Sequence, residues 1–320
     1  MTVSKRIALF LGVALAWIGV PVHAAYPDKP IKVVVPFVAG GITDAGARVL
    51  LDHMSQRLGV PVLVENRPGA GTKLGTRAVV AAPNDGYTLL MTNSNLTMVP
   101  AVESSPGYDA QRDLAPIGLA SDYGVAIVVK IALPVRTLHE LVQYAKRNPG
   151  RLSYGSAGVG SGTQLMAEHF KHLTGTDIVH VPYRSTALAI QDVAAGTLDL
   201  TFDGAARPYA DAGRVRVIAV TNPQRDPRFP DVPTVGEQGL PAMTLVSYLG
   251  LFAPRGTSPA VVERLNRALN LAATDAGVRS RLAELGMTPR GGSPAEMVRR
   301  VSAELAYYRR VVEAAGLKFE

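Results

Sequence analysis

Cysteine is absent from all 320 residues of the chain. Disulfide bonds therefore add nothing to its stability, which must come from packing of the hydrophobic residues that make up 47% of the sequence. That hydrophobic content excludes an intrinsically disordered chain. The lack of cysteine also excludes a lipid-modified cysteine behind a leader segment, so we expect a freely diffusing protein rather than a tethered one.

Long uncharged apolar runs are scarce as well, and the clearest one lies at the N-terminus. Lys5 and Arg6 precede an apolar run over residues 7–20, and Pro21-Val22-His23-Ala24 follows it with small residues at the positions that a signal peptidase reads. The run is about fourteen residues long, whereas a membrane-spanning helix needs roughly twenty. We predict a secretory signal peptide over residues 1–24, cleaved between Ala24 and Ala25, and an exported, soluble mature protein of the periplasm.

The excess of basic residues is dispersed rather than gathered into one patch. The formal net charge is +7, and Lys5 and Arg6 of the predicted leader account for two of these charges. Arginine pairs at residues 299–300 and 309–310 stand at helical spacing. We interpret them as solvated helix faces and expect no nucleic-acid partner.

Motifs for several other functions are missing. Residues 155–163 lack the Lys-Ser/Thr pair of a Walker loop and depart from the dinucleotide-binding pattern at its third glycine. No G-x-S-x-G elbow surrounds Ser156 or Ser161, and no H-E-x-x-H sequence occurs. We therefore expect no enzyme activity, although a secreted hydrolase on an α/β scaffold is a weaker alternative, and we expect no cofactor.

A cluster of histidines offers one possible metal site. His169 and His172 share a helix face beside Glu168, and His180 stands on the next predicted strand. These residue types can ligate zinc. A helix surface that carries two histidines is the simpler interpretation, and no metal is predicted.

What the chain does contain is a strand, a glycine loop and a helix in sequence near the start of the mature region. Residues 31–35 are rich in β-branched residues and predict a buried parallel strand. A loop over residues 37–42 follows. Thr43 or Asp44 is then expected to cap a helix that Gly59 ends.

The same order recurs in the middle of the chain. A strand over residues 152–154 leads into a glycine-rich loop over residues 155–162 and a helix that ends before Gly175. Other predicted elements alternate along the chain, with strands at residues 60–65, 87–92, 178–181, 198–202, 215–220 and 245–252 and helices ending near 81 or covering 187–195, 259–273, 277–284 and 294–315. This alternation predicts an α/β fold with parallel sheets and helices on both faces.

Two α/β lobes, the second inserted into the first, account for this order economically. The chain would cross between the lobes near residues 122–128 and 244–251. Lobe 1 would then comprise residues 25–124 and 246–320, and lobe 2 residues 125–245. Ligands in open α/β sheets bind beyond the carboxyl ends of the strands, so both glycine loops would face one cleft.

Neither glycine loop contains a lysine or an arginine. Each precedes a helix N-terminus, where unpaired N–H groups and the helix dipole favour an anion. Thr43, Ser156, Ser161 and Thr163 could add hydroxyl donors. One such loop alone could be no more than a tight turn, but two in repeated lobes predict a small acid held from both sides without a cationic side chain.

Asp203 follows the apolar strand that ends at Phe202. Two interpretations stay open for its carboxylate. It could cap the next helix, or it could face the cleft and orient a ligand amine, a ligand hydroxyl or a bridging water.

Eight segments spread over nearly the whole mature chain carry a family resemblance. They are YPDKPIK (26–32), VPFVAGGITD (35–44), ENRPGAG (65–71), DGYTLL (85–90), YGSAGVGS (154–161), HVPYR (180–184), VPTV (232–235) and GLFAPRGT (250–257). In these segments the chain resembles the Bug (Bordetella uptake gene) family, the extracytoplasmic solute receptors of tripartite tricarboxylate transporters.

The resemblance implies a two-lobed periplasmic-binding-protein (flytrap) fold, type II-like, whose cleft holds a small carboxylate such as a dicarboxylate, an amino acid or an aromatic acid. It also implies binding through backbone amides, small hydroxyl groups and ordered water. By position, the first lobe would contact the ligand through Phe37, Ala39, Gly41, Thr43, Asp44, Thr92, Asn93 and Asn95. The second lobe would contribute Ser156, Gly160, Ser161, Thr163 and Asp203.

Membrane subunits of such a transporter are the partner that the resemblance implies, and a monomer is expected of a diffusing receptor. A sensory receptor of the same fold that feeds a signalling partner is the alternative. Three positions depart from the family pattern. Val38-Ala39 replaces a double proline, Ser185 replaces the usual glycine after Arg184, and Tyr248 stands near a usual tryptophan. These departures bear on which acid is bound.

Overall fold

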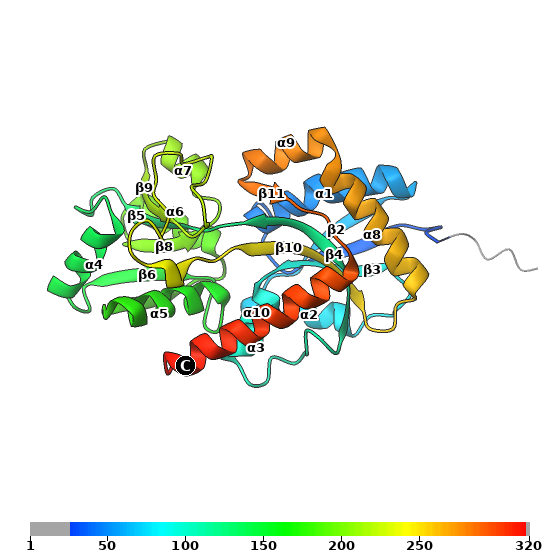
Figure 1. The fold of residues 1–320 in the computed structure, drawn as a ribbon, viewed down its shortest axis with the longest axis horizontal. Coiled ribbons are helices and arrows are strands. Elements are labelled where there is room, and N and C mark those ends of the chain that lie inside the picture. The colour runs from blue at the N-terminus through cyan, green and yellow to red at the C-terminus, as the bar shows by residue number, and fades with distance from the viewer. Residues whose placement is uncertain (1–25, 318–320) are drawn as a thin grey trace, which may run out of the picture.

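Two sheets, joined by long strands, organise residues 26–317, the part of the chain that this computed structural model describes (Figure 1). The predicted signal peptide lies outside these residues. The first sheet has the order β11-β4-β10-β3-β1-β2. Its strands are β1 (Ile31–Val35), β2 (Val62–Asn66), β3 (Thr88–Asn93), β4 (Leu114–Tyr123), β10 (Ser247–Pro254) and β11 (Met287–Pro289).

The second sheet has the order β7-β6-β8-β5-β9. Its strands are β5 (Ala126–Lys130), β6 (Leu152–Ser156), β7 (Ile178–Pro182), β8 (Leu200–Asp203) and β9 (Val215–Val220). The helices that pack around this sheet are α4 (Leu138–Arg147), α5 (Gly162–Thr174), α6 (Thr186–Ala195) and α7 (Arg207–Asp211). A short 3₁₀ turn, η2 (Pro241–Met243), precedes the return to the first sheet.

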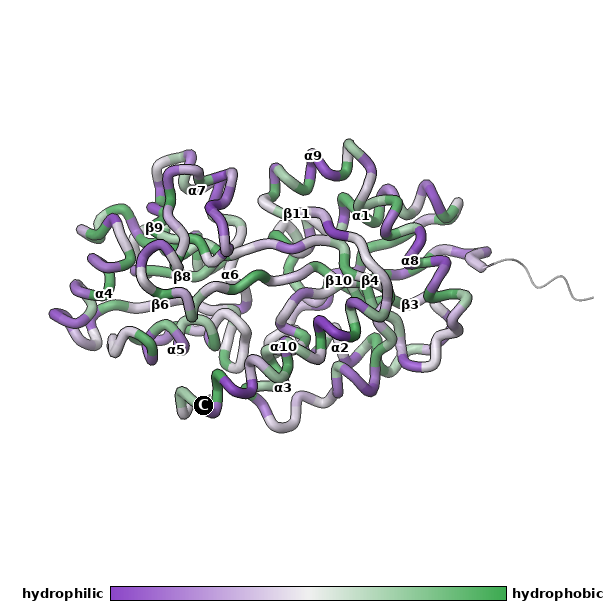
Figure 2. Tube along the Cα trace, viewed as in Figure 1, coloured by the Kyte–Doolittle hydropathy of each residue, from purple (hydrophilic) through white to green (hydrophobic). Residues whose placement is uncertain are grey.

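Helices cover both faces of the first sheet because its central strands are apolar on both sides. On β1, Ile31, Val33 and Val35 face one core and Val34 faces another. The helices and turns beside this sheet are α1 (Ile42–Leu58), η1 (Ala70–Thr72), α2 (Lys73–Val80), α3 (Asn95–Val102), α8 (Pro259–Thr274), α9 (Ala276–Glu284) and α10 (Pro294–Ala314). Around the second sheet, Figure 2 shows hydrophilic stretches on the outer helices α4 and α7.

Both sheets are mixed rather than parallel, which corrects the expectation from the sequence. In the first sheet β10 pairs antiparallel with β3 and β4, and in the second β5 pairs antiparallel with β8 and β9. The register explains this direction. The first residue of β5, Ala126, pairs with the last residue of β8, Asp203. A strand that enters a sheet at the carboxyl ends of its neighbours must run against them.

The first helix begins earlier than predicted. Gly41, not Thr43 or Asp44, is the N-cap of α1, and no side chain caps this end. Gly59 ends the helix in a left-handed conformation, as expected. In the second repeat the strand–loop–helix order is present, with Ser161 as the N-cap of α5 and Gly175 after its last turn.

One arginine of the C-terminal pairs, Arg300, is half-buried and paired rather than fully solvated. Arg300 on α10 lies 2.6 Å from the Glu304 carboxylate and donates to the Val246 carbonyl, also at 2.6 Å. It also lies 3.6 Å from Asp122 at the end of β4. Arg299 is exposed, as are the two arginines at 309–310. Arg300 therefore ties α10 to both chain crossings, which are the segments on either side of Gly124 and Val246.

Thr221 joins the two crossings to the second sheet. Its hydroxyl accepts the Val125 N–H at 2.9 Å and donates to the Leu245 carbonyl at 2.9 Å. The side chain is fully buried. Its backbone also pairs with both crossings, since Thr221 N–H donates to Val125 and Leu245 N–H donates to Thr221.

We predict that Thr221→Val lowers the free energy of unfolding by about 2 kcal/mol or more, because it leaves a buried N–H and a partly buried carbonyl without their hydroxyl partner. Chemical denaturation would measure the change. Thr201→Val is the matched control, since Thr201 is equally buried but makes one side-chain hydrogen bond, to Gly155. Equal losses in the two variants would contradict the linking role of Thr221.

Candidate functional site

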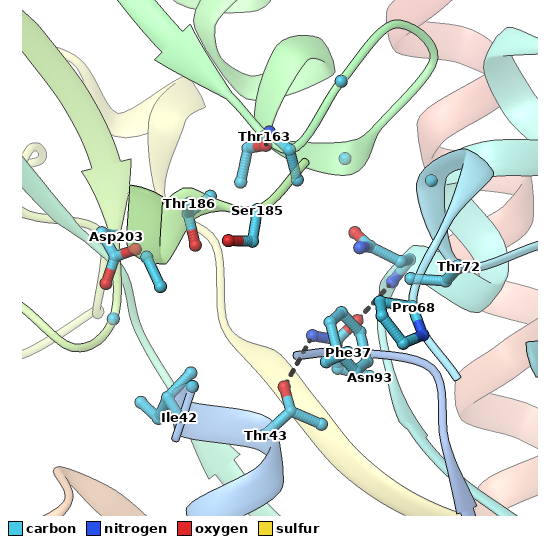
Figure 3. A pocket seen from close by; sticks show the side chains of 18 of the residues that line it. Phe37, Ile42, Thr43, Pro68, Thr72, Asn93, Thr163, Ser185, Thr186 and Asp203 are labelled. Atoms are coloured by element: carbon cyan, nitrogen blue, oxygen red, sulfur yellow. Dashed lines mark hydrogen bonds between the residues drawn. The ribbon is translucent and has the colours of Figure 1, made fainter. Parts of the chain in front are cut away.

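A cavity of about 690 Å³ lies between the two sheets, beyond the carboxyl ends of their parallel strands. Residues from both sides and from both crossings line it. Figure 3 shows ten labelled side chains from the two sides. The first-sheet side includes Phe37, Ile42, Thr43, Pro68, Thr72 and Asn93. The second-sheet side includes Thr163, Ser185, Thr186 and Asp203.

The first glycine loop presents an uncapped helix end to this cavity. Gly41, Ile42 and Thr43 line it at the start of α1. The first N–H groups of a helix have no carbonyl partner within it, and they lie at the positive end of its dipole. Because no side chain caps α1, these N–H groups are available to an acceptor in the cavity.

Asp44 holds this loop in place from inside the protein. Its carboxylate accepts the Gly40 N–H at 2.9 Å and the Asn66 amide at 2.8 Å, and it pairs with Arg48. Asn66 also donates to the Phe37 carbonyl. Burial alone would raise the pKa of Asp44, but the hydrogen bonds from these partners outweigh it and hold the pKa below its usual value.

A buried polar cluster forms the floor of the cavity on the first-sheet side. The Asn93 amide donates to Thr43 Oγ1 at 3.1 Å and to the Tyr123 hydroxyl at 2.9 Å. Burial raises the pKa of Tyr123, so its phenol is neutral. Asn93 Oδ1 in turn accepts the N–H of Asn95, the first residue of α3.

Two helix ends reach the cavity from the second sheet. Gly162 and Thr163 begin α5, and Ser185 is the N-cap of α6, where Thr186 and Ala187 follow. Both N-caps are serines whose hydroxyls accept an N–H of their own helix, at Gln164 and Leu188. The earlier first-turn N–H groups have no acceptor within these helices.

The second glycine loop satisfies several of its own N–H groups. Ala157 donates to Thr163 Oγ1 at 2.9 Å, Gly158 to Ser156 Oγ at 3.1 Å and Gly160 to Gln164 Oε1 at 2.7 Å. These side chains therefore hold the loop in shape. The hydroxyls of this loop serve its own backbone first, in contrast to the free donors that the sequence suggested.

Asp203 projects toward the cavity from the end of β8 (Figure 3). It does not cap α7, whose N-cap is Ala206, but its Oδ1 accepts the Ala205 N–H at 2.5 Å. Burial raises the pKa of its carboxyl, while hydrogen bonds from Thr186 and Ala205 and the charge of Arg228 oppose this shift. Asp203 is a buried carboxyl that lines the cavity.

The rest of the cavity wall is mostly apolar. Its larger apolar members are Pro36, Phe37, Val38, Ile42, Pro68, Met98, Val159, Met166, Phe202 and Leu245. Besides Asp203, the lining residue with a formal charge is Arg184, which is exposed. The glycine loops lack a cation as expected, but the cavity as a whole does not.

The residues predicted to contact a ligand fall into two groups. Those that line the cavity are Phe37, Gly41, Thr43, Asn93, Asn95, Thr163 and Asp203. Those that do not line it are Ala39, Asp44, Thr92, Ser156, Gly160 and Ser161. The structure explains why most of the second group does not reach the cavity. Asp44 and Ser156 accept hydrogen bonds from backbone N–H groups of the glycine loops, and Thr92, Ser156 and Ser161 have no exposed surface.

Several lining residues escaped the sequence analysis. They include Tyr123 and Ser247 at the crossings, the 68–72 loop, and residues 183–187 before and within α6. A signal for the last two existed, because both segments directly follow a strand of a predicted repeat. Residues 183–187 were not predicted because they contain no glycine, and the 68–72 loop was not predicted because it is separate from the first glycine loop.

The histidines considered for zinc do not come together. His169 Nε2 lies 3.4 Å from the Ala242 carbonyl, whereas His180 contacts Ser156 and Gln164. Within residues 26–317, no group of three or more His, Cys, Asp or Glu side chains is placed to hold a metal ion. No helix in this range is both long and apolar enough to cross a membrane.

Two α/β sheets that enclose a cavity between the carboxyl ends of their strands define the class of two-lobed solute-binding proteins. The sequence profile of the TctC family, described as "Tripartite tricarboxylate transporter family receptor", matches residues 46–317. The chain belongs to this family. Protein BugT of Bordetella pertussis is 32% identical over 326 residues, which cover 100% of both chains.

Solved structures agree in fold over almost the whole chain. MatC from Rhodopseudomonas palustris with bound malate has a TM-score of 0.85 and 32% identity, covering 90% of this chain and 100% of that one. R. palustris Rpa4515 with adipate has a TM-score of 0.87 and 33% identity, covering 92% and 99%. These findings confirm the fold class and the family expected from the sequence, and relatives of this kind are solute-binding receptors rather than enzymes.

We predict that Asp203→Asn raises the free energy of unfolding near neutral pH. The folded state raises the pKa of Asp203, so it disfavours the ionised form relative to the unfolded chain. The stabilising effect of the substitution should shrink as pH falls toward the ordinary value of 3.8, where the native carboxyl is protonated. Denaturation at several pH values would measure it. A variant less stable than the parent at neutral pH would contradict this account.

Proposed function

We propose that this protein captures a small carboxylate in the cavity between its sheets and delivers it to the membrane subunits of a tripartite tricarboxylate transporter. In this proposal residues 25–124 and 246–320 act as one lobe and residues 125–245 as the other. The lobes close on the ligand by bending at the two crossings, near Gly124 and Val246, and the receptor acts as a monomer.

One observation carries the proposal: N-termini of α1, α5 and α6, from both sheets, line the same cavity. Each such end attracts a carboxylate through its free N–H groups and its dipole. Closure would bring ends from opposite lobes onto one molecule. A ligand gains from closure only through contacts that the open form does not make.

The arrangement favours an acid with two acceptor ends. One carboxylate would meet α1, and the other end would meet α5 or α6, while the apolar wall packs against the carbon chain between them. Two relatives bind acids of this kind: malate, which has a short carbon chain, and adipate, which has a longer one. We propose small dicarboxylates as the first ligands to test, and Asp203 as a contact to a ligand hydroxyl, amine or ordered water.

We also propose that the leader directs export to the periplasm. The positive residues Lys5 and Arg6, the apolar run and the small residue Ala24 support this. Protein recovered from the periplasm should begin at Ala25, as determined by N-terminal sequencing. Recovery of a chain that still carries residues 1–24 would contradict cleavage at this site.

We predict that Thr186→Val weakens malate or adipate binding by about tenfold, because it removes a hydroxyl at the N-terminus of α6 that lines the cavity while keeping the side chain's shape. Isothermal titration calorimetry would measure the dissociation constants. Thr197→Val is the control, since Thr197 lies beyond the other end of α6 and is exposed.

An unchanged affinity in Thr186→Val would exclude the Thr186 hydroxyl, which also hydrogen-bonds to Asp203, as a contributor to binding. Failure of the unmodified protein to bind any small carboxylate, with no rise in melting temperature, would contradict the proposed ligand class. A ligand that binds the folded state raises apparent stability by mass action, about 2.7 kcal/mol at a hundred times its dissociation constant. Thermal shift is therefore a suitable first screen.

A further inference from the structure

His180 on β7 contacts two side chains, Ser156 and Gln164, that hydrogen-bond to glycines of the second glycine loop. Its Nε2 lies 2.6 Å from Ser156 Oγ, and its Nδ1 lies 3.2 Å from Gln164 Nε2. Its ring stacks on Tyr154 of the neighbouring strand, with centroids 4.9 Å apart and planes at 19°. None of the binding contacts described above involves this histidine directly.

The hydrogen bonds around His180 determine where its proton lies. The Gly160 N–H can only donate, so the Gln164 atom that it meets at 2.7 Å is the carbonyl oxygen. The NH₂ group of Gln164 therefore faces Nδ1, which must accept. The ring proton is then on Nε2, from which it donates to Ser156 Oγ, and the imidazole is neutral.

Ser156 links His180 to Gly158 through hydrogen bonds. Its hydroxyl accepts the Gly158 N–H at 3.1 Å and donates to the Gly158 carbonyl at 3.2 Å. Gly158 has a φ of 107° and Gly160 a φ of 74°, conformations that glycine adopts most easily. Gly158 lines the cavity, and Gly160 precedes the N-cap of α5.

We propose that His180 is a positioning residue for the cavity: its neutral form holds Gly158 through Ser156 and Gly160 through Gln164, and its protonation frees the Gly160 end of the loop and weakens ligand binding. The part that concerns affinity rests on the proposed function. The part that concerns the loop does not.

Protonation of Nδ1 would place two donors face to face across the 3.2 Å contact with Gln164. Rotation of the Gln164 amide would relieve this clash by turning its oxygen to Nδ1. The Gly160 N–H would then face an NH₂ group and lose its acceptor. Either arrangement removes one hydrogen bond from a buried part of the loop.

The charged groups near His180 affect its pKa in opposite directions, so burial has the larger effect. Glu168 on α5 attracts the imidazolium, but it is engaged by Lys171 at 3.0 Å and by the Tyr154 hydroxyl at 2.5 Å. Lys171 repels a proton on the ring. Burial is the largest influence and lowers the pKa of His180 below 6.5, so the Gly160 end of the loop is held at neutral pH and is freed only in acid.

Nitrogen-15 NMR of the ligand-free protein tests the geometry without any variant. At pH 8 we expect His180 to carry its proton on Nε2, and on acidification we expect hydrogen exchange at the Gly160 amide to become faster relative to its intrinsic rate at each pH as the ring titrates. A proton on Nδ1, or a Gly160 amide indifferent to that titration, would overturn the proposal.

Gln164→Glu tests the coupling. A carboxylate accepts from both Gly160 N–H and Nδ1–H, so it should stabilise the imidazolium and raise the titration of His180 by about one pH unit or more. His172→Gln is the matched control, because His172 lies exposed on the same helix. It should leave the titration of His180 unchanged.

Calorimetry with malate and adipate between pH 8 and pH 5 gives the affinity readout. Acid should weaken binding by the parent by about tenfold beyond the ligand's own titration. This loss should be smaller in Gln164→Glu, whose carboxylate keeps both hydrogen bonds when His180 is protonated, and unchanged in His172→Gln. Coincident pH profiles would overturn the positioning role. Binding of neither acid would overturn the proposed ligand class, and the NMR result alone would then decide the role of His180.

Discussion

The two crossings of the chain between its sheets are the constraint on which the other features depend. β4 leaves the first sheet at the edge where its parallel strands end, and β10 returns at the same edge, paired antiparallel with β4. This places the carboxyl ends of the strands of both sheets around one cavity. The helices that follow those strands therefore direct their N-termini into it. Thr221 and Arg300 hold the two crossings together by contacts to Val125, Leu245 and Val246.

Much of the polar part of the cavity lining comes from helix ends rather than from charged side chains. Charged side chains near the loops are used inside the protein, as Asp44 is with Arg48 and Asn66. Hydroxyls of the second glycine loop satisfy its own N–H groups. What reaches the cavity is a set of helix ends, the cluster of Asn93, Thr43 and Tyr123, and one buried carboxyl, all within an apolar wall. Such a surface suits a small anion with a carbon skeleton better than a highly charged one.

Local sequence patterns predicted the elements that have a strong local signal. The strands at residues 31–35 and 215–220 match, and Gly59 and Gly175 mark helix ends as expected. A strand at residues 245–252 was expected and corresponds to β10, but the antiparallel direction of β5 and β10 could not be predicted, because strand direction depends on where the chain enters the sheet. α3 was missed because Pro100 interrupts its short pattern. α4 carries a capping box at Thr137 and Glu140 that should have revealed it.

The loops of the candidate site could be predicted from the sequence, but not the individual side chains that line it. A strand followed by a glycine loop and a helix correctly indicated which loops meet, since both loops contribute lining residues. Which hydroxyls face the ligand could not be predicted, because Ser156 and Thr163 have partners that only the folded loop supplies. Arg184 and the α6 end were overlooked for lack of glycines.

A crystal structure of the protein with malate would test the central claim most directly. The account predicts carboxylate oxygens within hydrogen-bond distance of backbone N–H groups at the start of α1 and at the start of α5 or α6. A malate held chiefly by the Arg184 guanidinium, or bound outside the cavity between the sheets, would contradict it.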